Sequence, residues 1–472
     1  MRGRGLFTTF LSIGLAAALT GCWGGSAPRS IPAGTSNLTL TIQDTPPAGG
    51  TILSFQVSIT GAVLNPAQTG GVSNSLQPVS VLNAPVDVEL TQLATYSALL
   101  NEATVPEGSY QGITITFGGA RLTYLNSSGA DMGSCANGTI CELTPTISPS
   151  VVTVSAAPAF PISLYASTPG GLQIDFNLAQ SIQGDLSVVY PAITISQLSA
   201  SQGSQGSQGI GQMNNLEGQV TSVNSTYLQF AMNTSIAPIT ILTNTSTQFD
   251  GFAEQGLTNN FAGVQVGQTV RSQAILLADG TLNATIVGLR QTTSEAQVPQ
   301  LKGTITSIDS GTAFHMVVRD ELRQVNGILV GDVVAVTLQG APTFSIESDG
   351  LTIPSGLSFA SASDLMVGQE VQITAATGST GSEVTTDQII LRMSDITATV
   401  NAINPTGFTL GNLPSLYPTA GISAIQVAST PETTYNNVLN LTTGEVIAVR
   451  GLLFNSSETP TLVAGTVGPQ IY

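Results

Sequence analysis

The sequence feature that most constrains the fold is a period-two alternation of apolar and polar residues in short runs. Residues 38–43 alternate in this way, the turn-forming stretch 44–47 ends the run, and residues 53–59 resume the alternation. Because successive side chains of a strand point to opposite faces, these runs predict half-buried β-strands. Further runs of this kind predict an antiparallel, immunoglobulin-like β-sandwich over residues 37–198. Residues 90–100 have apolar residues at helical spacing, which predicts one short helix on the sandwich.

A tandem Ser-Gln-Gly repeat at residues 201–209 marks the clearest domain boundary. Linkers of this composition are flexible coils. We therefore expect residues 199–215 to let the second half of the chain reorient relative to the first.

The second half of the chain repeats itself. The segment 216–223 is echoed at 301–308 and, less closely, at 396–403, and a glycine-led strand signal follows later in each copy. Units of about 80 to 90 residues suffice for a five- or six-stranded antiparallel barrel. The all-β prediction is thus a sandwich followed by about three small barrels. Their expected bounds are 216–295 (unit 1), 300–393 (unit 2) and 394–472 (unit 3).

Motifs in both halves resemble known families. The turns around Asp44/Pro46 and Val105–Tyr110, with the Asp175-Phe176 strand, are similar to the bacterial lipoprotein family catalogued as domain of unknown function four-three-eight-two. This sequence has one extra residue between Asp44 and Pro46. We expect the phenol of Tyr110 to hydrogen-bond to backbone at a sandwich corner, and Asp175 to face away from Ile174 and Phe176.

The barrel units resemble the bacterial family catalogued as domain of unknown function five-six-six-six. Its pattern is a G-x-V/I-x-x-V/I opening strand and a later V-G-x-x-V strand. Gly218 and Gly267 carry both motifs in unit 1, and Gly303 and Gly368 carry them in unit 2. The third unit lacks the opening glycine.

The N-terminus is typical of an export signal. Arg2 and Arg4 precede an apolar run that ends near Leu19 and is too short to span a bilayer. The stretch Leu19-Thr20-Gly21-Cys22 resembles the lipobox of bacterial lipoproteins, which implies cleavage before Cys22 and its diacylation, for example with palmitate. The alternative is an ordinary signal peptide or an N-terminal anchor, with Cys22 a bystander.

The resemblance to a lipobox predicts where in the cell the protein is located. Residues 1–21 would be removed, Cys22 would hold the lipid, and residues 22–36, rich in Gly and Pro, would form a flexible tether. The residue after the cysteine is Trp23 and not an aspartate. By resemblance to the sorting rules of bacterial lipoproteins, this favours the outer membrane. The expected membrane contact is therefore through the lipid alone.

The charge of the chain excludes several partners. Only 8% of the residues are charged, and the formal net charge is −17, which becomes −19 once Arg2 and Arg4 leave with the signal. Nucleic-acid binding needs clustered Lys and Arg, whereas Lys302 is the only lysine here. We expect no nucleic-acid partner. A lysine–asparagine cross-link of the kind found in some surface adhesins could occur at most once.

Cys135 and Cys141 flank a short loop that contains the turn-forming pair Asn137-Gly138. In an exported protein this spacing favours a disulfide across the loop. Chain-entropy arithmetic gives it about 2 kcal/mol. A metal or redox pair is a weaker reading, because the spacing is not CxxC and the only histidine, His315, is distant in sequence.

The inventory of reactive residues predicts no catalytic, cofactor or metal site. Any Ser-His-Asp or Cys-His site must use His315, whose strand-like apolar surroundings indicate a packed or edge residue. The carboxylate pairs Asp320/Glu321 and Glu347/Asp349 could serve a glycosidase, but nearby turn residues suggest solvated loops. The same acids with Asp250 and Glu254 could collect calcium, although no D-x-D-x-D-G loop is present.

The sequence therefore predicts a non-enzymatic envelope lipoprotein that binds or scaffolds glycan or protein partners. Strand-rich domains in series suit the recognition of extended partners through loops or sheet edges. Two alternatives remain: a carbohydrate-active hydrolase that uses a carboxylate pair in a cleft, and a structural spacer, which would have no concave apolar site.

Overall fold

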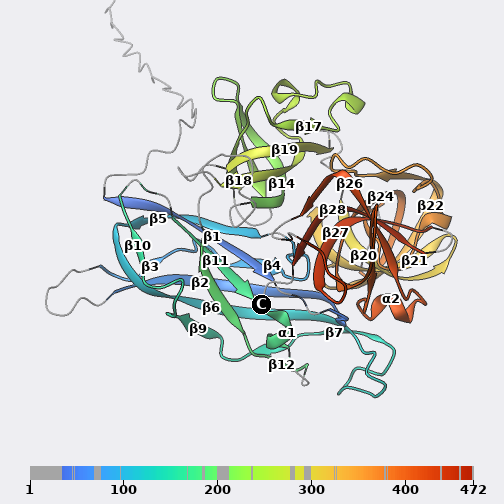
Figure 1. Cartoon of the computed structure of the whole chain (residues 1–472), viewed down its shortest axis with the longest axis horizontal. Helices are drawn as coiled ribbons and strands as arrows, with labels where there is room; N and C mark the ends of the chain where they lie inside the picture. Colours follow the sequence, from blue (N-terminus) through green and yellow to red (C-terminus); the bar gives the residue numbers. More distant parts are fainter. Residues whose placement is uncertain are drawn as a thin grey trace, which may run out of the picture.

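The computed structural model describes residues 34–469 apart from short gaps, and its all-β fold is shown in Figure 1. The gaps are residues 45, 47, 68–75, 96, 167, 169, 183–185, 199–211, 235–237, 277–281, 292–298, 324, 326, 377–378, 380, 436–437, 439 and 457–458. The predicted signal, Cys22, the tether up to residue 33 and most of the Ser-Gln-Gly linker lie outside the described residues. No helix among the described residues is long and apolar enough to cross a membrane.

The N-terminal domain is a two-sheet sandwich, which confirms the predicted architecture. One sheet has the order β13 (Ile193–Gln197), β11 (Gly170–Phe176), β1 (Thr35–Asp44), β5 (Ala98–Pro106). The other has the order β10 (Ile162–Leu164), β6 (Gly108–Leu125), β2 (Ile52–Pro66), β3 (Val79–Ser80), with β4 (Val86–Glu89) on β2 and β7 (Ile140–Leu143) and β9 (Val151–Val154) on β6. The short strands β8 (Thr146–Ile147) and β12 (Val188–Val189) pair separately, and helix α1 spans Leu178–Ser181.

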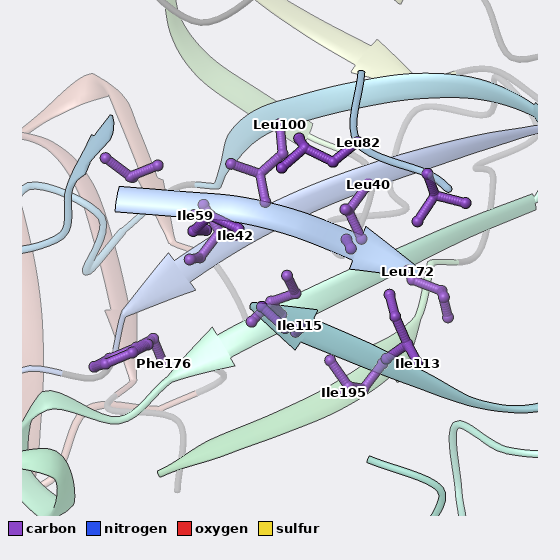
Figure 2. Close-up of a cluster of buried hydrophobic side chains, with 14 of the residues drawn as sticks. Leu40, Ile42, Ile59, Leu82, Leu100, Ile113, Ile115, Leu172, Phe176 and Ile195 are labelled. Carbon is purple, nitrogen blue, oxygen red and sulfur yellow. The ribbon is translucent and has the colours of Figure 1, made fainter. Parts of the chain in front are cut away.

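The apolar positions of the alternating runs meet between the two sheets. Leu40 and Ile42 of β1, Ile59 of β2 and Ile115 of β6 are fully buried there, as Figure 2 shows. The ring of Phe176 packs 5.9 Å from that of Phe55. Two pairings depart from a purely antiparallel pattern, because β1 runs parallel to β11 and β8 runs parallel to β12.

The predicted helix at residues 90–100 is wrong. Residues 91–97 form an irregular turn wherever they are described, and β5 begins at Ala98. Leu99 pairs with Thr41 of β1 and belongs to a strand. The described apolar residues at helical spacing are leucines buried on two different elements, the turn and the strand β5 that follows it. Pairing with β1 makes Ala98–Pro106 a strand instead of a helix.

The three repeat units are small barrels with one connection order. Unit 1 contains β14 (Gln212–Asn224), β15 (Gln229–Thr234), β16 (Pro238–Leu242), β17 (Gln248–Asp250), β18 (Thr269–Leu276) and β19 (Leu282–Gln291), with 3-10 turns η1 (Ala253–Gln255) and η2 (Phe261–Gly263). Unit 2 contains β20 (Gln300–Ser310), β21 (Ala313–Arg323), β22 (Val333–Ile346), η4 (Ala362–Asp364), β23 (Glu370–Thr374) and the first part of β24 (Glu383–Asn404). Unit 3 contains the rest of β24, β25 (Gly407–Gly411), α2 (Leu416–Thr419), β26 (Ile425–Tyr435), β27 (Val446–Phe454) and β28 (Thr461–Pro469).

In every unit the first main strand pairs with the second and the fourth, and the third closes the barrel by pairing with the fifth in parallel. This five-stranded Greek-key arrangement is that of the OB-fold. Unit 3 follows it although Ala398 stands where units 1 and 2 have the opening glycine. The parallel closing pair is a feature that the alternation pattern did not predict.

Units 2 and 3 share one strand. Strand β24 pairs with β23 up to Arg392 and with β27 from Met393 onward. The chain therefore passes from one barrel into the next without a linker. In Figure 1 these two barrels lie together on one side of the molecule, beside the sandwich and unit 1.

Candidate functional site

The cationic side chains of the described residues converge on the junctions between domains. All seven whose side chains are described form ion pairs with carboxylates. They are Arg121, Arg271, Arg290, Lys302, Arg319, Arg392 and Arg450. The charge of these seven side chains is therefore neutralised by carboxylates.

The first junction cluster lies between units 1 and 2 and balances three cations against three carboxylates. Its members are Glu217, Arg271 and Arg290 of unit 1 and Glu347, Asp349 and Arg392 of unit 2. Asp349 pairs with Arg271 at 2.5 Å and also with Arg290. Arg392 donates to Glu217 across the junction at 2.8 Å. Each unit therefore buries charges that pair with charges of the other unit.

Burial and pairing shift the pKa values in this cluster. Burial alone would raise the pKa of Asp349, but Arg271 and Arg290 outweigh that effect and hold the pKa at about 2. Burial lowers the pKa of Arg271 to about 10, even though Asp349 opposes the change. Asp320 of β21 is the cross-strand partner of Lys302 on β20, and burial raises the pKa of Asp320 to about 6 against the opposing charge of Lys302.

The second junction cluster joins the sandwich to units 2 and 3, again with three cations and three carboxylates. Its charged members are Glu89 of the sandwich, Lys302, Arg319 and Glu370 of unit 2, and Asp395 and Arg450 of unit 3. Arg319 contacts the sandwich three times: its Nε lies 3.4 Å from Glu89, and its guanidinium donates to the carbonyl of Leu53 at 2.5 Å and to the hydroxyl of Thr91. A small, partly open cavity of about 90 Å³ lies beside this cluster.

The irregular turn at residues 91–97 supplies the neutral partners of the second junction cluster. Gln92 accepts from Lys302 Nζ at 2.9 Å and donates to Glu370 at 3.3 Å. Thr95 donates to Asp395 at 3.1 Å. The turn thus reaches both unit 2 and unit 3, which explains why its polar residues do not face solvent.

These contacts overturn the prediction that the second half of the chain reorients freely. Two neutral clusters of buried ion pairs connect the sandwich, unit 1, unit 2 and unit 3 in one arrangement. Burying a charge is favourable only when its partner is correctly placed. The linker composition indicated flexibility, but the paired charges hold the domains that it connects.

A groove of about 1010 Å³ opens where the sandwich meets units 2 and 3. Its walls come from the loop that Cys135 and Cys141 close, from β20 and β21, and from the segments 416–424 and 455–460 of unit 3. The described residues that line it are aliphatic, hydroxyl-bearing or glycine, with His315 and Asn455, and none is Asp, Glu, Lys, Arg or aromatic. The hydroxyl of Thr306, buried at the groove, makes no hydrogen bond among the described residues.

His315 lies at the edge of this groove with 40% of its side chain exposed. Its Nδ1 is 2.9 Å from Asp309 and 3.2 Å from the hydroxyl of Ser307. A nucleophilic triad needs serine on one ring nitrogen and the acid on the other. Here both neighbours contact the same nitrogen, so this trio does not have the triad geometry.

The sequence-predicted acids have different outcomes. Glu347 and Asp349 do not lie on solvated loops: their side chains are 18% and 4% exposed and pair with arginines, because unit 1 covers them. The side chains of Glu321 and Glu254 lie outside the described residues. Among the residues described, no group of three or more His, Cys, Asp or Glu is placed to hold a metal ion.

Two local predictions can be compared directly with the structure. Cys135 and Cys141 form a disulfide, with 5.7 Å between their Cα atoms. Tyr110 donates its hydroxyl proton to the carbonyl of Pro106 at 2.9 Å, which confirms the predicted corner. Asp44 belongs to the Asp44/Pro46 turn of the family resemblance. Its carboxylate accepts a hydrogen bond from the backbone amide of Leu178 at 3.1 Å and so positions α1.

The members of the junction clusters were missed because they have no common local motif. A weak signal exists, however. Arg290 and Arg392 each follow a leucine within an apolar strand. In a chain with only 8% charged residues, a charge inside an apolar strand indicates a buried partner from elsewhere.

Both family resemblances are confirmed. Residues 35–189 match the family described as Domain of unknown function (DUF4382), and residues 217–287 match Domain of unknown function (DUF5666). The first match covers the sandwich except for its last strand, β13, and the second covers most of unit 1. No curated protein matches the sequence.

Two solved structures are similar to parts of this chain. One is drosophila Unr CSD456, at 12% identity over 54% of this chain and 96% of that chain, with a TM-score of 0.13. The other is a multidomain protein with nucleic acid binding domains from Streptococcus pneumoniae TIGR4, at 12% identity over 52% of this chain and 72% of that one, with a TM-score of 0.11. TM-scores of this size support no conclusion about function.

Proposed function

We propose that this chain is a lipid-anchored protein of the cell envelope that acts as a non-enzymatic binding module. Its site is the groove between the sandwich and units 2 and 3. The groove is the observation that carries the proposal, because a structural spacer has no need of a concave surface lined by aliphatic and hydroxyl-bearing side chains. The second junction cluster supports it too, since it connects the sandwich to units 2 and 3, which form the three walls.

The lining of the groove favours an uncharged protein segment as the partner. Aliphatic side chains such as Ile308, Leu365 and Ile422 offer pockets for apolar side chains, and the Thr306 hydroxyl offers one buried polar contact. OB-folds use the loop between their fourth and fifth strands in binding. In unit 3 that loop includes Asn455 and Thr459, which line the groove.

The hydrolase alternative has less support. A glycosidase needs two carboxyl groups about 5 to 10 Å apart across a cleft. Of the predicted pairs, Glu347 and Asp349 are engaged by Arg290, and neither lines the groove.

A bulky side chain in the groove tests the binding site. Ser423 is exposed and lines the groove, so Ser423→Trp should occlude it while leaving the core intact. We expect at least a tenfold loss of capture of an envelope protein by the purified full chain, measured by cross-linking in envelope extracts. Ser355→Trp, also exposed but outside the groove lining, is the matched control.

Equal capture by the wild type and by Ser423→Trp would contradict the groove as the site. Binding on a glycan array that Ser423→Trp abolishes would keep the groove but replace the proposed partner class.

The membrane anchor is tested separately. If Cys22 holds the lipid, Cys22→Ser should move the protein from the membrane fraction to the soluble fraction, because a single removed anchor leaves no other expected membrane contact. Fractionation followed by immunoblotting measures this. Persistent membrane association of Cys22→Ser would contradict the lipid anchor.

A further inference from the structure

The only lysine of the chain lies in a buried trio with an amide and a carboxylate. Lys302 of β20, Glu370 of β23 and Gln92 of the sandwich turn are 2%, 4% and 7% exposed. The first two are on neighbouring strands, whereas Gln92 is 210 residues from Lys302 in sequence. The trio therefore exists only when the sandwich has docked on unit 2.

Each of the three groups contacts the other two. Lys302 Nζ lies 2.9 Å from Gln92 Oε1 and 3.6 Å from Glu370 Oε1. The same Glu370 Oε1 accepts from Gln92 Nε2 at 3.3 Å, and its Oε2 accepts from Thr304 at 2.7 Å. One carboxylate oxygen is thus within reach of both the amine and the amide nitrogen.

We propose that this trio forms a covalent cross-link, an amide bond between Lys302 Nζ and Gln92 Cδ, with Glu370 as the proton shuttle. The bond would join the sandwich to unit 2 irreversibly. Glu370 contacts both reacting groups and is a catalytic residue of this single-turnover reaction.

The reaction balances without any co-reactant. The neutral amine of Lys302 attacks Gln92 Cδ, and the new carbon–nitrogen bond forms. Glu370 accepts one proton from Nζ and delivers it to Nε2. The bond between Cδ and Nε2 then breaks, ammonia leaves, and Glu370 returns to its starting state. No group is oxidised or reduced.

The surroundings favour each requirement of this step. Burial lowers the pKa of Lys302, against the opposing effect of Glu370, so the neutral nucleophile is more accessible than at the surface. The docked domains hold the amine against the amide, which supplies the proximity that an intermolecular reaction lacks. The cavity of about 90 Å³, lined by Gln92 and Glu370, has room for the departing ammonia.

Peptide mapping of the purified full chain tests the proposal, and signal cleavage or lipidation does not affect it. The protein is unfolded, reduced, digested with pepsin and analysed by tandem mass spectrometry. We expect one linked peptide that joins the segments around Gln92 and Lys302, lighter than their sum by one ammonia.

Two variants test the assigned roles. Lys302→Arg keeps the positive charge but removes the amine, and Glu370→Gln keeps the shape but removes the proton shuttle. Both should lose the linked peptide while the free peptides appear. Near-ultraviolet circular dichroism of the same samples reports whether tertiary packing is retained.

Free Gln92 and Lys302 peptides from folded wild-type protein would overturn the proposal. A linked peptide that persists in Glu370→Gln would overturn the role of Glu370. A link between Lys302 and Glu370, recognised by loss of water, would overturn the assignment of Gln92. The groove is tested separately by Ser423→Trp, because Gln92, Lys302 and Glu370 do not line it.

Discussion

The two junction clusters have the same charge balance but different chemistry. In the first, between units 1 and 2, all three cations are arginines that face carboxylates. In the second, the sandwich contributes an amide and hydroxyl groups, and one cation is Lys302. A guanidinium stays charged and bridges several acceptors, whereas a buried amine loses its proton more readily. The first cluster can only orient its domains, and the second can also react.

The largest expected effect comes from breaking the first junction cluster. Arg290→Ala leaves Glu347 and Asp349 without their shared cation in a buried site. Removing one member of a buried ion pair costs about 3–5 kcal/mol. We expect a loss of that size in the stability of the paired barrels, measured from urea unfolding curves.

Arg121→Ala is the matched control for that experiment. Arg121 pairs with Asp332 at the contact between the sandwich and unit 2, where their side chains are 30% and 21% exposed. Partly exposed pairs contribute about 0–1 kcal/mol. An equal loss in both variants would contradict the idea that burial gives the first junction cluster its special weight.

A smaller effect is expected from Asp320, whose pKa is raised from 3.8 to about 6. Between these values the folded protein holds a proton that the unfolded chain has released. Stability contributed by Asp320 is therefore present below pH 3.8 and lost as pH rises through 6, by about 2–3 kcal/mol. Asp320→Asn should remove this loss, measured as urea midpoints between pH 4 and 7.

Burial sets the sign of this dependence, because it is the largest effect on the pKa of Asp320. Among the charged groups that face Asp320, Lys302 and Arg392 lower its pKa, whereas Glu217 and Glu370 raise it. Asp349 acts in the opposite sense: its pKa is about 2 in the folded protein, so its contribution is lost as pH falls from 3.8 toward 2. Parallel pH curves for the wild type and Asp320→Asn would contradict the assignment.

Local patterns predicted the elements of this protein well. The alternation from Leu38 to Gln43 predicted β1, and the repeated segment at 301–308 predicted the first strand of a barrel. The corner at Tyr110 also followed from nearby residues. These features depend on backbone pairing and side-chain periodicity within a few residues, which a single sequence records directly.

The junctions could not be predicted in the same way. Glu347 lies on a segment rich in turn residues, and only the cover of unit 1 makes it a buried partner of Arg290. The turn around Gln92 had the spacing of a helix, and its real role depends on groups more than 200 residues away. Such contacts have no spacing rule, because they form between surfaces of separate domains.

The sequence by itself determined the strands, the sandwich and the threefold repeat, because alternation and turn chemistry act locally. Only the tertiary structure decided how the domains dock, where the cations lie and which groups meet Lys302. The physical reason is the cost of burying charge: a scarce cation is buried only where docking brings its partner, and docking is a property of the whole folded chain.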